Sequence, residues 1–118
     1  MTEQEALDSI PDDWAKDISP AELKERTNAM WPSVVRGLAE ERGVRISPSD
    51  TTDKIISKLA RQQRRSKANI LQSLRDTCLQ NSKIDIFTEK YGHLFTQDKH
   101  GELSYSLPML RKITGLDL

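Results

Sequence analysis

The chain has few of the residues that mark disulfide-bonded, membrane-spanning or base-stacking proteins. Its 118 residues include one cysteine, five glycines and only 5% aromatic residues. A single cysteine cannot form an internal disulfide, and no apolar run approaches the ~20 residues of a membrane span or resembles a secretory signal. We therefore expect a protein of the cytoplasm that does not associate with membranes.

Patterns that carry catalysis or bind metals are also scarce. The only histidines, His93 and His100, have Asp98 between them but no companion at metal-ligand spacing. Cys78 falls on an apolar stripe, which favours a buried structural thiol over a nucleophile. The glycines occur singly and form no phosphate-binding loop. We expect no catalytic residue, no metal and no cofactor, and so not an enzyme.

Charge is abundant and unevenly distributed. The net charge is zero, yet residues 1–25 carry eight acids against two bases, and residues 54–75 carry seven bases and no acid. Such asymmetry indicates a basic surface for an anionic partner, or an acidic arm that folds over that surface. We expect residues 1–17 to form an acidic, loosely ordered arm and residues 18–118 to form a single, mainly helical domain.

Apolar spacing predicts that most of this domain is helical. An amphipathic helix should cover residues 20–42, with a kink or break at Pro32, which lacks a backbone N–H, and an end at Gly43. A second helix should begin at Pro48, with Ser47 as its N-cap.

The course of the second helix has two interpretations. In the first, one helix runs unbroken over residues 48–81, and its polar middle stands in solvent. In the second, the chain turns at residues 64–66, Ser66 caps another helix, and that helix ends at Asn81. The second interpretation gives a helix–turn–helix.

The C-terminal part changes pattern. Alternating polar and apolar residues over 94–107, around a turn at 98–101, predict a short β-hairpin. Residues 84–91 favour a helix. A last short helix should have Pro108 near its start and Gly115 at its end.

A helix, a turn, a second helix and a hairpin in this order resemble a winged-helix domain over residues 50–107. Residues at positions where such domains favour these types are Leu59, Ala60, Ser66, Ile70 and Leu74. In this chain Gln63 and Arg65 stand at usually apolar positions, and Arg64 stands at the usual turn glycine. The resemblance implies that the helix after Ser66 is the recognition helix.

Nucleic-acid binding, and duplex DNA more than RNA, is the function that the basic segment 54–75 indicates. Long cationic side chains bind phosphates, and side-chain amides read adenine edges. No aromatic residue interleaves the basic run, as single-strand stacking would require. The candidate nucleic-acid-binding residues of this regulatory protein are Arg61, Arg64, Arg65, Lys67, Asn69 and Gln72.

The alternative function is a non-catalytic helical module for protein–protein interaction. A continuous helix over residues 48–81 would present two apolar stripes to a partner helix or to a second copy, as in a homodimer. Its basic segment would suit an acidic protein. A turn at residues 64–66 with the hairpin beside it favours DNA binding, whereas a continuous helix there favours the interaction module.

Overall fold

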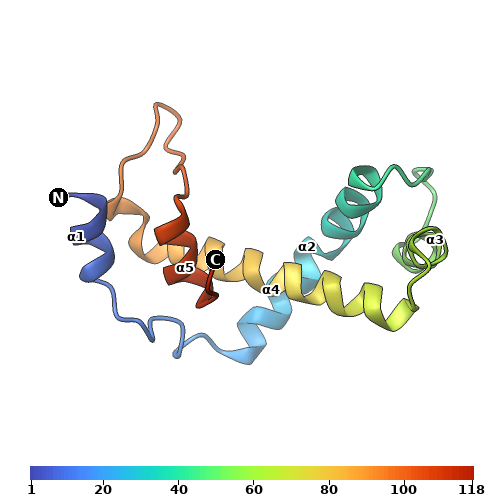
Figure 1. Cartoon of the computed structure of the whole chain (residues 1–118), viewed down its shortest axis with the longest axis horizontal. Helices are drawn as coiled ribbons and strands as arrows, with labels where there is room; N and C mark the ends of the chain where they lie inside the picture. The colour runs from blue at the N-terminus through green and yellow to red at the C-terminus, as the bar shows by residue number, and fades with distance from the viewer. The chain divides into compact units, whose positions relative to one another are not determined.

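The computed structural model describes all residues from Met1 to Leu118, and it consists of helices joined by turns (Figure 1). The predicted mainly helical fold is confirmed, and no β-strand is present. The helices are α1 (Glu3–Asp8), α2 (Pro20–Glu41), α3 (Thr52–Gln63), α4 (Lys67–Tyr91), the 3-10 helix η1 (Gly92–Leu94) and α5 (Leu107–Thr114).

Contacts divide the chain into two compact units. The central unit is Pro20–Leu79, and the terminal unit combines Met1–Ser19 with Gln80–Leu118. The chain passes from one unit to the other where α2 begins and again inside α4. The single domain expected over residues 18–118 stays a prediction. None of the helices combines the length and the apolarity that crossing a bilayer requires.

The core of the central unit is built by α2, α3 and the first turns of α4. Aliphatic side chains dominate it, and burying each contributes about 1.5–3 kcal/mol. Its buried members are Val35, Ala39, Val44, Ile55, Ile56, Leu59, Ile70 and Leu74, with Trp31, Val34, Leu38 and Ile46 packed against them. Cys78 is fully buried as predicted, and burial raises the pKa of its thiol.

The helix α2 matches its prediction at both ends, and of the kink or break expected at about Met30 to Trp31 the break is absent. It is continuous through Pro32, so the chain does not break there. At its end Gly43 adopts a left-handed backbone with φ of 68°. The Val44 N–H donates to the Ala39 carbonyl at 2.8 Å, which closes a Schellman motif.

The helix α3 begins at Thr52 rather than at Pro48. Residues 47–50 form a turn instead, in which the Asp50 carboxylate accepts the Ser47 N–H at 3.0 Å. The Arg36 guanidinium donates to the backbone carbonyls of this turn, which a helix begun at Pro48 would use for its own N–H groups. Thr51 then serves as N-cap, and its hydroxyl accepts the Lys54 N–H at 3.2 Å.

The helix α4 does not end at Asn81 but continues to Tyr91, which confirms the helix expected over residues 84–91. Buried residues recur along it at four-residue spacing, at Cys78, Ser82 and Ile86. This buried face continues the helix past the asparagine, because packing outweighs a local preference for a helix end.

The terminal unit packs around an aromatic cluster. Trp14 meets Phe87 edge to face at a centroid distance of 5.3 Å, and Phe87 lies 5.4 Å from Tyr91 and 5.9 Å from Phe95. The Trp14 indole N–H donates to the Lys112 carbonyl at 3.1 Å. This bond fastens the N-terminal segment to α5.

Residues 1–17, which the sequence predicts to be an acidic, loosely ordered arm, include one short helix and several buried side chains. Residues Glu3–Asp8 are helical, and four apolar side chains of the segment are buried: Ala6, Leu7, Ile10 and Trp14. Leu7, Ile10 and Trp14 follow one another at spacings of three and four residues. The surrounding acids are exposed, so they give the segment its charge without preventing it from packing.

The segment predicted as a β-hairpin forms a turn without strands. A single antiparallel bridge joins Gln97 to Leu103. The Asp98 carboxylate accepts the His100 N–H at 2.8 Å and the Glu102 N–H at 2.9 Å, and these bonds replace strand pairing. The wing of a winged-helix domain is therefore not shown. The last helix is confirmed, with Gly115 at its end at φ of 71°.

We predict that the N-terminal segment contributes to stability. In a Trp31→Phe background, where Trp14 fluorescence reports on the terminal unit, Ile10→Ala should lower the free energy of unfolding by about 2–4 kcal/mol. The matched control Asp17→Ala, at an exposed position, should change it by less than about 0.5 kcal/mol. Equal urea midpoints for both variants would show that the segment does not pack.

Candidate nucleic-acid interface

The chain turns sharply between α3 and α4. Arg64 has a left-handed backbone with φ of 53° and ψ of 39°, and the Arg65 N–H donates to the Ala60 carbonyl at 3.0 Å. The Ser66 hydroxyl accepts the Asn69 N–H at 3.1 Å and so caps α4. The structure thus has the helix–turn–helix and not one continuous helix.

All six predicted nucleic-acid-binding residues are exposed and lie in the central unit. Arg61 is in the last turn of α3, Arg64 and Arg65 form the turn, and the other three lie on the first two turns of α4. Figure 1 views α3 end-on and α4 from the side, so the two helices run in clearly different directions from the turn. The arrangement gathers the six residues around one turn.

The lysines of the basic segment have acidic partners. Lys58 and Lys54 approach the two oxygens of Asp50 at 2.7 and 3.2 Å. Lys67 pairs with Asp53 at 2.7 Å, which joins the first turns of α3 and α4. These lysines act within the fold, and Lys67 offers a phosphate less charge than its sequence position indicates.

The arginines of the segment remain available. Arg61, Arg64 and Arg75 are exposed and take part in no ion pair. Arg65 donates to the Ser73 hydroxyl at 3.2 Å, so its guanidinium lies along α4. The positive surface of the helix–turn–helix is therefore made mainly by arginines, whose planar donors suit phosphate oxygens.

The two amide side chains differ in their surroundings. The Gln72 Nε2 donates to the Asp76 carboxylate at 2.9 Å. Asn69 uses its backbone N–H for the Ser66 cap, and its exposed side chain makes no hydrogen bond within the chain. Both amides stand on the exposed face of α4 with free hydrogen-bonding groups.

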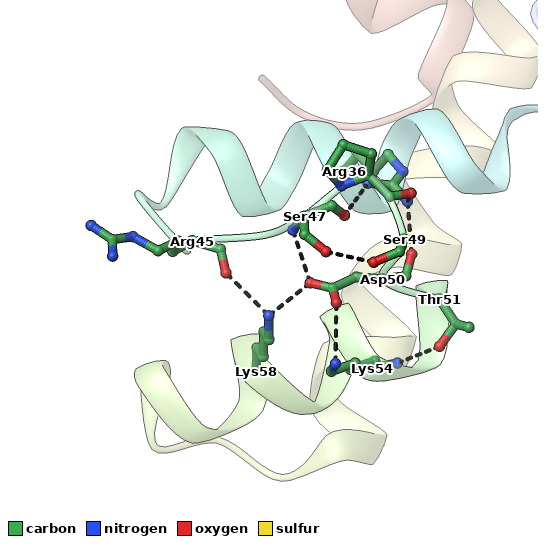
Figure 2. A network of polar contacts seen from close by, with 9 residues as sticks. Arg36, Arg45, Ser47, Ser49, Asp50, Thr51, Lys54 and Lys58 are labelled. Atoms are coloured by element: carbon green, nitrogen blue, oxygen red, sulfur yellow. Dashed lines mark hydrogen bonds and ion pairs between the residues drawn. The ribbon is translucent and has the colours of Figure 1, made fainter.

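A network around Asp50, which the sequence prediction missed, holds the start of α3 in place (Figure 2). The Asp50 side chain is only 4% exposed. It accepts hydrogen bonds from Lys58 at 2.7 Å and from the Ser47 N–H at 3.0 Å. These two bonds, in that order, hold the pKa of Asp50 well below its ordinary value of 3.8, with a further contribution from Lys54.

The same network reaches α2 through Arg36. Its guanidinium donates to the backbone carbonyls of Asp50 at 2.7 Å, and of Ser47 and Pro48 at 3.4 Å each. Figure 2 shows these bonds closing the loop between α2 and α3. A sequence signal was present, because Lys54 follows Asp50 at the four-residue spacing of helical ion pairs.

No group of three histidine, cysteine, aspartate or glutamate side chains is placed to hold a metal ion. Comparison of the chain with protein-family models, curated proteins and solved structures found no match. The function must therefore be inferred from the geometry of the helix–turn–helix.

We predict that Asp50 stabilises the fold in a pH-dependent way. Because its pKa is lower in the folded than in the unfolded chain, its contribution is fully present above about pH 4 and is lost as the pH falls further. Asp50→Asn should lower the urea midpoint at neutral pH, and the difference from the natural chain should shrink below about pH 4.

The matched control is Asp53→Asn, which removes an exposed partner of Lys67. Surface ion pairs contribute little, so this variant should shift the midpoint much less. Circular dichroism at several pH values measures both variants. A pH-independent effect of Asp50→Asn would rule out the carboxylate charge as the cause.

Proposed function

We propose that the helix–turn–helix of α3 and α4 binds duplex DNA and that the protein is a non-catalytic, DNA-binding regulatory protein. The observation that carries the proposal is the backbone of Arg64. It is the only residue other than glycine with a positive φ. Its side chain is exposed and takes part in no ion pair, at the point where the chain enters α4.

The end of α2 shows which residue type the backbone at the end of α3 would favour for the fold alone. The ends of α2 and α3 have the same hydrogen-bond pattern, and the left-handed position is Gly43 in the first and Arg64 in the second. A left-handed backbone costs a residue with a side chain about 1–2 kcal/mol. Strain of this kind is typical of functional sites. An arginine that the fold does not need fits a role outside the fold.

The surroundings of Arg64 support an anionic ligand. Arg61 and Arg65 extend the cationic surface, and the N-terminus of α4 adds the favourable end of a helix dipole. Asn69 and Gln72 follow on the exposed face, where an α-helix in the major groove would present them to base edges. The groove of double-stranded RNA does not admit a helix in this way, which favours DNA.

The proposal uses α3 and α4 without a wing. Residues 97–103 form a turn with one bridge, so no hairpin contact with DNA is included. One continuous helix over residues 48–81 would have favoured the alternative, a protein–protein interaction module. The turn at residues 64–66 supports DNA binding, although the segment expected beside it as a hairpin forms no strands. A homodimer on DNA stays a hypothesis that the stoichiometry of the complex measures.

We predict that binding to a mixed-sequence duplex falls steeply with salt. Three or four phosphate contacts give a slope of log affinity against log salt of about −3 to −4. Replacing Arg64 and Arg65 together with alanine should reduce the slope by about 2 and weaken binding to all sequences alike. Fluorescence anisotropy over a salt series measures both.

The matched control replaces Arg42 and Arg45, two exposed arginines in the loop after α2, and so changes the net charge equally. It should leave the slope nearly unchanged. An absence of binding at low salt, or a tighter complex with an RNA duplex of equal length, would contradict the proposal.

A second prediction separates the ligand role of Arg64 from its structural cost. Arg64→Gly should relieve the left-handed backbone, so the free energy of unfolding should rise by up to about 1 kcal/mol while DNA affinity falls. Arg64→Lys should keep both the backbone cost and most of the affinity. If Arg64→Gly instead lowers stability, the residue serves the fold and the proposal loses its main support.

A further inference from the structure

An acid stands on the surface that we propose for DNA. Asp76 is exposed and lies one turn after Gln72 on α4, where its carboxylate accepts the Gln72 Nε2 at 2.9 Å. Asn69, Gln72, Ser73 and Asp76 follow one another at the spacing of one helix face. A carboxylate on this face repels phosphates, so it weakens the affinity that the arginines supply.

The hydrogen bond between Gln72 and Asp76 determines which groups of the Gln72 amide remain free to bind a ligand. A glutamine amide offers one carbonyl oxygen and two N–H donors. A carboxylate accepts hydrogen bonds only, so Asp76 selects the amide orientation in which nitrogen faces it. The Gln72 oxygen and its second N–H are then left for another partner.

These two remaining groups match adenine. In the major groove adenine presents the N6 amino group as donor and N7 as acceptor, and a glutamine amide binds both at once. Without such a bond the amide of an exposed glutamine can rotate and exchange its oxygen and nitrogen. A bond that fixes the amide before binding reduces the conformational entropy that is lost on binding. Asn69 has no such support for its side chain.

We propose that Asp76 is a positioning residue that makes Gln72 selective for adenine in duplex DNA. The inference rests on the proposed DNA binding and adds the base that is read and the residue that enforces it. Asp76 reduces the affinity for every sequence and increases the difference between sequences. Its removal should therefore change affinity and selectivity in opposite directions.

The experiment uses the full chain and a pool of duplexes with randomised sequence, whose bound fraction is sequenced. The natural chain should enrich adenine at one position by about tenfold or more. Asp76→Ala should raise affinity for the unselected pool about two- to fivefold, because one repulsive charge is gone. It should also reduce the adenine enrichment to the level of Gln72→Ala.

Two variants distinguish positioning from charge. Asp76→Asn removes the charge and keeps an oxygen acceptor but adds a donor, so it no longer allows only one orientation of the Gln72 amide. It should raise affinity as much as Asp76→Ala does and retain only part of the adenine enrichment. The double variant Gln72→Ala with Asp76→Ala should lose no more selectivity than Gln72→Ala alone, because the two residues act as one unit. Asp85→Ala, which removes an exposed acid further along α4, should leave selectivity unchanged.

An atomic test follows at the selected position. Replacing its adenine by 7-deazaadenine removes the N7 acceptor, which should weaken binding of the natural chain strongly, of Asp76→Asn less, and of Asp76→Ala not at all. Retained enrichment in Asp76→Ala overturns the inference, as does binding of the pool with the expected salt slope but without any adenine preference. Failure of the natural chain to bind the pool overturns the proposed DNA binding as well.

Discussion

The central unit depends on the hydrogen bonds and ion pairs of the Asp50 carboxylate. Asp50 is the only buried charged residue of the chain, and a buried charge is tolerated only when its oxygens are fully bonded. Lys58 and the Ser47 N–H bond one oxygen, and Lys54 pairs with the other. Arg36 binds the backbone carbonyl of the same residue. The first turn of α3 is thereby tied to α2. The position of α3 in turn determines where Arg64 and the first turn of α4 stand.

The sequence predicted correctly those helix ends that depend on the residues at the end itself. Gly43 and Gly115 end their helices as expected, since a left-handed backbone favours glycine wherever the rest of the chain lies. The start of α3 was misplaced because local capping patterns do not show that Arg36 of α2 binds the backbone carbonyls of residues 47–50. That contact depends on how α2 and the loop meet. In the same way the buried face of α4 continued past Asn81, where local preference had indicated an end.

The sequence predicted that the six candidate residues are exposed around one turn, but not which of them have partners within the chain. Exposure follows from polarity, so the six residues could be found from the sequence. Their partners depend on how two helices meet, and no spacing rule shows that Lys67 reaches Asp53 across the turn. Gln72 and Asp76 lie four residues apart, a spacing that was visible but could not be interpreted without the face of the helix. In residues 1–17 the high content of acids outweighed the helical spacing of the apolar side chains in the prediction, although these side chains pack.

The turn at residues 64–66 also affects how readily proteases can cleave the chain. Arg64 and Arg65 are exposed between two helices, where enzymes that cleave after basic residues would find two arginines together. A cut there would separate α3 from α4 and divide the aliphatic core of the central unit between two fragments. A ligand seated on the turn would shield the same peptide bonds. Under the proposed function, a bound ligand would therefore slow cleavage at this short stretch of backbone.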